Sequence, residues 1–308
     1  MFSACLLTLQ RLSYPTLALA NVMKKKVTVG LIQMRSESSP EVNLMKAQGK
    51  VSEAAKRGAQ IVCLQELFRG PYFPQSKDKR YFRFAEAVPG PTTGVFSALA
   101  KRSKVVIIVP LFEKAEEGTY YNTAAVIDAN GEILGTYRKT HLPNDPYYCE
   151  QFYFSPGDSG FKIFDTKYAK IGVLICWDQW FPEAARHLAL SGAQILFYPS
   201  AIGWISGESK RARSEERSAW EMIQRSHAIA NGIYVASVNR VGREGKLAFW
   251  GGSFVSGPLG EMIARAGSAR EEILMAECDL SKIEKIRKVW PFLKSLRPDV
   301  YETKALIS

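Results

Sequence analysis

The sequence has few of the residues that build metal centres and disulfide frameworks. Only three histidines occur among 308 residues, and none belongs to an H-E-x-x-H segment, so we expect no metal and no other cofactor. The five cysteines form no C-x-x-C pair and follow no regular spacing. Such an odd, scattered set argues against a disulfide scaffold and favours a reducing, cytoplasmic compartment.

Long apolar runs are also missing. No stretch of the sequence approaches the roughly 18 apolar residues that a membrane span requires, so we expect no membrane partner. Residues 1–22 contain a short apolar stretch, but no positive charge precedes it and Pro15 interrupts the region. Met23 stands directly before three lysines and the first strand-like run. We therefore interpret residues 1–22 as an extension outside the fold, with a targeting segment as the alternative.

The charge is unbalanced, with 41 lysines and arginines against 30 acidic residues and a formal net charge of +11. This excess allows a non-catalytic nucleic-acid-binding protein as one hypothesis. That hypothesis requires basic residues interleaved with exposed aromatic residues, or a known binding motif. The basic clusters are instead scattered and fit solvated faces, so we expect no nucleic-acid partner. They lie at 24–26, 101–104, 210–213 and 282–288.

Secondary-structure patterns favour an α/β protein. From residue 27 onward, short β-branched runs alternate with amphipathic stretches. Strands are predicted at 27–34, 61–64, 105–109, 171–175, 195–198 and 233–238, and helices at 42–57, 93–102, 183–190 and 214–230.

Each half of the chain ends in a hairpin-like stretch. The spacing of the first, 123–137, reappears near 255–262. Two similar halves suggest two sheets packed face to face with helices outside, which is a four-layer αββα sandwich. Because no Ser/Gly-rich linker separates the halves, we predict one domain at 23–308. Its basic C-terminal segment, 280–308, is expected to pack on another surface, such as that of a second subunit.

Three ionisable residues follow apolar strands, where ligand crevices form in α/β sheets: Glu66, Lys139 and Cys176. We expect Cys176 at a strand-to-helix elbow, where a helix N-terminus and a nearby lysine would favour the nucleophilic thiolate. Glu66 would take the thiol proton and later activate water, while Lys139 and the N–H of Trp177 would hold the oxyanion. The rival hypothesis pairs Cys176 with His141, although no residue that would orient the imidazole is identifiable.

Three sequence blocks around these residues resemble the signatures of the nitrilase, or carbon–nitrogen hydrolase, family. They lie at 65–68, 137–143 and 174–186. The resemblance extends from about residue 27 to 301. It implies the αββα fold, amidase chemistry without a cofactor on a small-molecule substrate, and a homodimer or larger homo-oligomer.

The same resemblance assigns catalytic roles. It implies Cys176 as the nucleophile, Glu66 as the general base and Lys139 as the cation at the tetrahedral intermediate. The family often has a second glutamate between the lysine and the cysteine. Glu150 matches that position, and we expect it to orient Lys139 or the substrate amide.

Further blocks, at 197–204, 224–232 and 290–293, resemble the branch of the family that acts on N-carbamoylputrescine. The implied products are putrescine, carbon dioxide and ammonia. The cationic end of this substrate calls for a carboxylate in the pocket. We expect Glu208 to supply it, with Trp177 and Tyr72 as walls.

The exact substrate stays open at this stage. Residues 205–207 depart from the His-Pro that relatives often carry after the tryptophan, which weakens the assignment of Glu208. The alternatives are another carbamoyl amine, a ureido acid or a simple amide. An arginine in the pocket, such as Arg186 or Arg240, would favour an acid, whereas a buried carboxylate would favour an amine.

Overall fold

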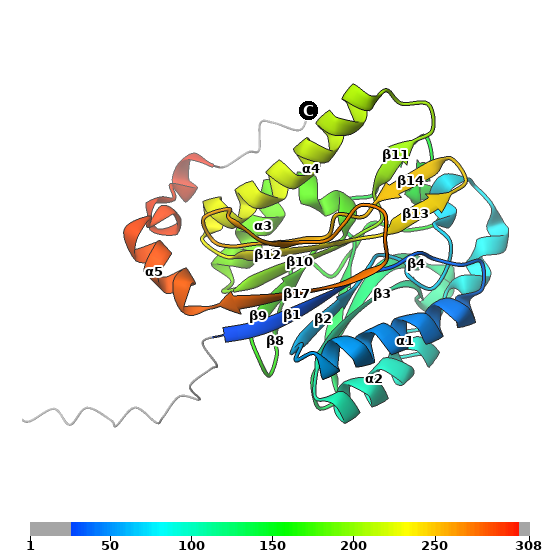
Figure 1. Ribbon diagram of the computed structural model, residues 1–308, viewed down its shortest axis with the longest axis horizontal. Coiled ribbons are helices and arrows are strands. Elements are labelled where there is room, and N and C mark those ends of the chain that lie inside the picture. The colour runs from blue at the N-terminus through cyan, green and yellow to red at the C-terminus, as the bar shows by residue number, and fades with distance from the viewer. Residues whose placement is uncertain (1–25, 302–308) are drawn as a thin grey trace, which may run out of the picture.

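The computed structural model describes residues 26–301, which form two six-stranded sheets lying face to face with helices on both outer sides (Figure 1). This arrangement confirms the predicted αββα sandwich. The interpretation of residues 1–22 as an extension lies outside the described residues.

The first sheet contains, in spatial order, β17 (Glu272–Asp279), β1 (Lys26–Gln33), β2 (Ile61–Leu64), β3 (Val106–Lys114), β4 (Tyr120–Ile127) and β5 (Ile133–Arg138). The second contains β16 (Met262–Arg265), β15 (Phe254–Ser256), β12 (Tyr234–Asn239), β10 (Ile195–Ser200), β9 (Lys170–Val173) and β8 (Ile163–Asp165).

The central strands of each sheet run parallel. Strands β1, β2 and β3 are parallel neighbours in the first sheet, as are β9, β10 and β12 in the second. Glu66 follows β2 and Cys176 follows β9. Both residues therefore leave the sheets at carboxyl ends of parallel strands, where α/β folds form their crevices.

Four helices form the outer layers. Helices α1 (Pro40–Lys56) and α2 (Pro91–Ser103) cover the first sheet, and α3 (Pro182–Leu190) and α4 (Lys210–Asn231) cover the second (Figure 1). Ser39 and Ser209 begin α1 and α4, because each hydroxyl accepts a hydrogen bond from the backbone N–H three residues later. Gly232 ends α4 in the left-handed conformation, with φ +58°.

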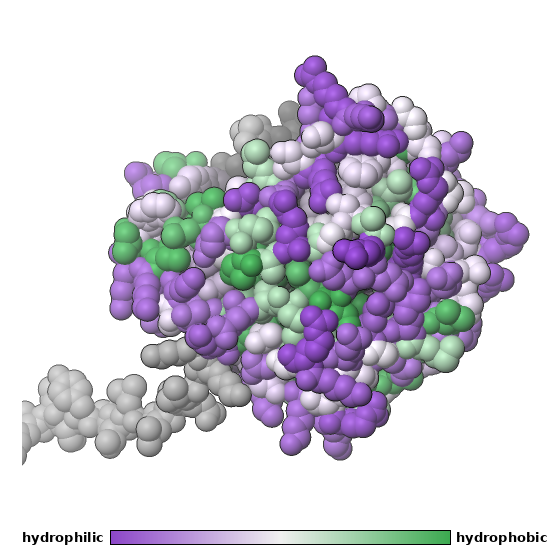
Figure 2. All heavy atoms as spheres, viewed as in Figure 1, coloured by the Kyte–Doolittle hydropathy of each residue, from purple (hydrophilic) through white to green (hydrophobic). Residues whose placement is uncertain are grey.

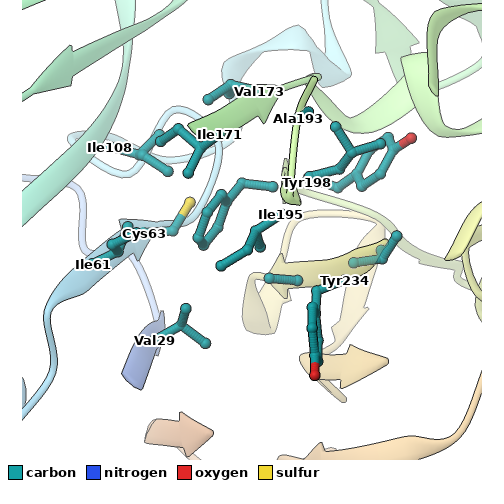
Figure 3. Packing of buried hydrophobic residues seen from close by; sticks show 14 of the residues in the cluster. Val29, Ile61, Cys63, Ile108, Ile171, Val173, Ala193, Ile195, Tyr198 and Tyr234 are labelled. Carbon is teal, nitrogen blue, oxygen red and sulfur yellow. The ribbon is translucent and has the colours of Figure 1, made fainter. Parts of the chain in front are cut away.

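The main hydrophobic core lies between the two sheets. Figure 3 shows Val29, Ile61 and Cys63 of the first sheet close to Ile171 and Ile195 of the second. All five side chains are fully buried. Strand β1 contacts β12, and β2 contacts β10, so removal of apolar surface from water joins the sheets.

Several short or distant strands were not predicted. Strand β17 returns from the second half of the chain to pair antiparallel with β1 at the edge of the first sheet. A separate three-stranded sheet is formed by β11 (Gly203–Ile205), β14 (Leu247–Trp250) and β13 (Val241–Glu244), and a two-stranded one by β6 (Asn144–Asp145) and β7 (Tyr148–Cys149). These small sheets provide part of the wall of the cavity described below.

The C-terminal segment begins with a helix, α5 (Ser281–Val289), which has basic residues in its last turn. Large apolar side chains stay exposed at its end, namely Val289, Trp290 and Phe292. Figure 2 shows a largely hydrophilic face with apolar residues gathered beside α5. None of the helices within 26–301 is long and apolar enough to cross a membrane.

Candidate active site

The fold brings three of the expected catalytic side chains into direct contact. Lys139, which follows β5, places its Nζ 2.9 Å from Glu66 Oε1. The same Nζ lies 2.8 and 2.6 Å from the two carboxylate oxygens of Glu150. All three side chains are fully buried. Cys176, only 4% exposed, is close enough for its charge to affect the pKa of Lys139.

The ammonium of Lys139 is held charged between its two carboxylates. Burial alone would lower the pKa of Lys139, but the charges of Glu150 and Glu66 raise it above its ordinary value. For Glu150, burial and repulsion from Glu66 outweigh the attraction of Lys139 and raise the pKa. Lys139 therefore stays positively charged, and its single charge lies between the two carboxylates.

Glu66 and Glu150 differ in the freedom of their oxygens. Glu66 Oε1 accepts hydrogen bonds from Lys139 and from Asn122 Nδ2, at 2.7 Å for the latter, whereas Oε2 is buried without a partner in the described part of the chain. Both oxygens of Glu150 are engaged by Lys139, and Oε1 also accepts from the Tyr72 hydroxyl at 2.8 Å. Only Glu66 thus offers an unoccupied carboxylate oxygen for a proton.

The placement of Tyr72 differs from the expected one. Tyr72 was predicted as a wall of the substrate pocket, but its side chain is 1% exposed and its hydroxyl donates to Glu150. It is not among the residues that line the cavity next to Cys176. The direction of a loop side chain depends on tertiary packing, and Tyr72 packs on Tyr148 and Phe249. The spacing of residues in the sequence does not contain this information.

Cys176 occupies a tight elbow, as expected. It begins a short 3₁₀ turn, residues Cys176–Trp180, and has φ +46°, a left-handed conformation that costs energy for a residue with a side chain. Asp178 stabilises the elbow, because its Oδ2 accepts from the N–H of Ile175 at 2.8 Å and from the Tyr137 hydroxyl at 2.7 Å. Asp178 was missed in the sequence, although it lies two residues after the cysteine.

His141 belongs to this supporting structure. Its Nδ1 lies 2.8 Å from Asp178 Oδ1, and its ring stacks on Phe181 with centroids 3.6 Å apart. No hydrogen bond joins it to Cys176 within the described residues. The geometry therefore does not support the alternative Cys–His dyad.

The surroundings of Cys176 act on its pKa in opposite directions. A helix N-terminus and Lys139 were expected to favour the thiolate. Instead, burial raises the pKa of the Cys176 thiol, the charge of Glu66 raises it further, and the opposing effect of Lys139 is smaller. Burial and the charge of Glu66 therefore disfavour the thiolate, so that nucleophilic attack needs a base.

A buried arginine supports the loop that carries Glu66. Arg240 donates hydrogen bonds to the backbone carbonyls of Glu66, Leu67 and Gly70 at 2.8–3.0 Å. It also pairs with Glu244 at 2.8 Å. Since the Arg240 guanidinium is committed to these partners, it does not reach the cavity as a substrate-binding group. Arg186 likewise donates to a carbonyl of α4, that of Ala230.

A cavity of about 390 Å³ opens directly onto Cys176. Its wall carries three carboxylates and four aromatic residues but no lysine or arginine among the described lining residues. Trp177 and Glu208, both expected to bind substrate, lie in this wall, whereas Glu216 and Asp145 were not foreseen. The charged and aromatic lining residues are Asp145, Glu208, Glu216, Tyr148, Trp177, Trp180 and Trp250.

No group of three or more histidine, cysteine, aspartate or glutamate side chains is placed to hold a metal ion in the part of the chain that the structure describes. The chemistry available at this site comes from a thiol, a free carboxylate oxygen and a fixed ammonium. These are the components of nucleophilic acyl transfer.

Comparison with known proteins agrees with this chemistry. The family model described as carbon–nitrogen hydrolase matches residues 28–288. The chain is 45% identical to the N-carbamoylputrescine amidase of Solanum lycopersicum, an alignment covering 90% of this chain and 94% of that protein. It is 38% identical to a citrullinase of Francisella tularensis, and the alignment covers 90% of this chain and 97% of that protein. The solved structure of a carbon–nitrogen hydrolase from Helicobacter pylori superposes with a TM-score of 0.87 at 43% identity, covering 90% of this chain and 97% of that one.

Proposed function

The chain belongs to the carbon–nitrogen hydrolase family and hydrolyses carbon–nitrogen bonds of linear amides, and from this premise we propose that its substrate is N-carbamoylputrescine. The products are putrescine, carbon dioxide and ammonia. The observation that carries the proposal is the cavity beside Cys176, whose wall, over residues 26–301, has three carboxylates and no basic residue. Such a wall favours a substrate with a cationic far end and disfavours one with a carboxylate.

The first step is the attack of Cys176 on the ureido carbon. The thiol proton passes to the unoccupied Oε2 of Glu66 as the new C–S bond forms. The negative charge that develops on the ureido oxygen is held by the ammonium of Lys139 and the N–H of Trp177. Glu66 then returns the proton to the terminal nitrogen, and ammonia leaves.

The second step clears the thioester. Glu66 takes a proton from a water molecule, whose oxygen attacks the same carbon and releases the Cys176 sulfur with that proton. The product is a carbamic acid, which splits into carbon dioxide and putrescine. One water molecule is consumed for each ammonia released, so the atoms balance. Glu150 and Tyr72 keep Lys139 in place throughout both steps.

We assign the distal ammonium to Glu208. Its backbone lies in the loop between β11 and α4, and its Oε2 accepts a hydrogen bond from the N–H of Ile205 at 2.9 Å. That bond fixes the carboxylate at the cavity wall without using its second oxygen. The walls near the alkyl chain include Trp177 and Ile202, which supply apolar surface for four methylene groups.

The test is ammonia release from a panel of substrates, with Cys176→Ala as the control. The panel contains N-carbamoylputrescine, N-carbamoyl-β-alanine and a simple aliphatic amide. We expect N-carbamoylputrescine to have the highest kcat/KM and the Cys176→Ala variant to be inactive. A preference for the ureido acid would overturn the substrate, and activity surviving in Cys176→Ala would overturn the nucleophile.

The remaining expectations from the sequence stand as proposals. We propose that residues 23–308 act as one domain, that the enzyme is cytoplasmic, and that it forms a homodimer or larger assembly. The exposed apolar end of α5, with Val289, Trp290 and Phe292, supports the last of these. Light scattering of the full chain should give at least twice the monomer mass, and a chain beginning at Met23 should keep its activity.

A further inference from the structure

A second carboxylate, Glu216, reaches the cavity from helix α4. Glu216 and Ala219 both line the cavity, while Glu208 approaches from the loop that precedes the helix. Figure 1 shows the loop that leads from β11 to the start of α4. The two glutamates therefore come from different elements and face the same space.

Glu216 differs from the neighbouring acidic residues of α4 in having no ion pair among the described residues. Glu215 pairs with Arg211 at 2.7 Å, and Glu221 pairs with Arg225 at 3.1 Å. Burial raises the pKa of Glu216 and the negative charge of Glu208 raises it further, against a smaller opposing effect of Arg213. The two carboxylates thus repel each other across the cavity, and a cation bound between them would relieve this repulsion.

The rest of the wall also suits an organic cation. Rings of Tyr148, Trp177, Trp180 and Trp250 surround the cavity, and aromatic faces attract ammonium groups. The wall of this cavity therefore offers both carboxylates and aromatic faces to a cation.

We propose that Glu216 and Glu208 form a two-carboxylate clamp for one primary ammonium group, with Glu216 as a specificity-determining residue. This rests on the proposed function, in which the far end of the substrate is an amine. A primary ammonium has three N–H donors, so it can hydrogen bond to both carboxylates at once. A neutral or acidic far end leaves two like charges facing each other. The clamp therefore selects carbamoylated diamines over other ureas.

The test compares two substrates that differ only at the far end. N-carbamoylputrescine carries the ammonium, whereas N-pentylurea has a methyl group in its place. The quantity measured is the ratio of their kcat/KM values. We expect Glu216→Gln to lower this ratio about tenfold, since a charge-assisted hydrogen bond is lost from a partly screened site.

Glu215→Gln is the matched control, because it removes the same charge one residue away on α4 from a side chain that is paired with Arg211 and does not line the cavity. We expect that variant to keep the wild-type ratio. Equal ratios in wild type, Glu216→Gln and Glu215→Gln would overturn the clamp. Turnover of N-pentylurea by Glu216→Gln shows whether the variant is folded, and Glu216→Asp provides a second variant if it is not.

The two proposals fail in different ways. If the wild-type enzyme itself shows no preference for N-carbamoylputrescine over N-pentylurea, the proposed function is wrong. If the wild type prefers N-carbamoylputrescine strongly and Glu216→Gln retains that preference, only the clamp is wrong, and Glu208 alone anchors the amine.

Discussion

The most informative residue of the site is Lys139, which is fully buried and lies between two carboxylates that have different tasks. Glu150 uses both of its oxygens to hold the lysine, while Glu66 keeps Oε2 unoccupied. A buried cation with these partners cannot move far without leaving an uncompensated charge. Its position relative to Cys176 is therefore fixed before the substrate arrives, as electrostatic stabilisation of an oxyanion requires.

Replacement of Tyr72 by phenylalanine tests how Lys139 is held. The variant removes one hydrogen bond to Glu150 and should cost about 1 kcal/mol of stability. Because Tyr72 does not line the cavity, we expect kcat to fall several-fold at nearly constant KM. Steady-state kinetics of Tyr148→Phe provide the contrast, since Tyr148 lines the cavity and bonds to β11. A rise in KM alone for Tyr72→Phe would mean that Tyr72 contacts the substrate.

The thiol of Cys176 makes a second prediction, concerning pH. Burial and the charge of Glu66 raise its pKa, so the thiolate fraction is small at neutral pH and grows as pH rises. The rate at which iodoacetamide alkylates Cys176 should therefore rise continuously up to about pH 9. Peptide mass spectrometry measures the alkylated fraction over time at each pH. A plateau in the rate below pH 8 would mean that the thiol is ionised in the resting enzyme.

At the scale of elements, strand β11 positions one side of the cavity. Its first residue, Gly203, approaches β14 so closely that a Cβ would lie 2.6 Å from the Ala248 carbonyl oxygen and 2.7 Å from the Phe249 Cα. Tyr148 also bonds to both backbone groups of Gly203. The loop with Glu208 follows this strand, so its place depends on that contact.

Gly203→Ala should push β11 away from β14 and raise KM for N-carbamoylputrescine several-fold, with a smaller effect on kcat. Gly49→Ala is the control, because it lies inside α1 with no atom near its added Cβ. It should instead stabilise the protein by about 0.5–1 kcal/mol without a kinetic effect. Thermal unfolding and steady-state kinetics measure both outcomes. An unchanged KM in Gly203→Ala would show that β11 does not position the amine site.

The loop after β2 depends on one buried side chain from the other half of the chain. Arg240, between β12 and β13, binds three carbonyls of this loop. Arg240→Ala would remove the guanidinium donor from all three carbonyls and the ion-pair partner from Glu244, and should lower stability by about 3–5 kcal/mol. Urea unfolding measures the loss. A cost below 1 kcal/mol would mean that the loop holds Glu66 without Arg240.

At the scale of the whole molecule, the surface charge and the cavity charge have opposite signs. The chain carries a formal charge of +11, yet the described wall of the cavity has carboxylates and no basic residue. A cationic substrate thus gains nothing from the global field. Its recognition falls to a few carboxylates that act over short distances, where screening by salt is weaker.

The molecule also shows what the sequence could predict. Hydrophobic periodicity located the main helices and central strands, because the burial of each element is visible in the pattern of its own residues. Strand β17 was missed because it completes a sheet begun more than 200 residues earlier. In the site, the positions of Glu66, Lys139 and Cys176 could be predicted because each residue follows the end of an apolar strand. The orientation of Tyr72, the raised pKa of Cys176 and the roles of Asn122 and Arg240 depend on tertiary neighbours that no spacing records.

The central claim is that this hydrolase acts on a carbamoylated diamine, and a competition assay tests it most directly. Equal concentrations of N-carbamoylputrescine and citrulline are mixed with the enzyme, and putrescine and ornithine are measured as products. Both substrates present a ureido group, but citrulline adds a carboxylate that the acidic cavity disfavours. We predict at least about tenfold more putrescine than ornithine, which corresponds to roughly 1.4 kcal/mol. Equal or greater production of ornithine would contradict the account.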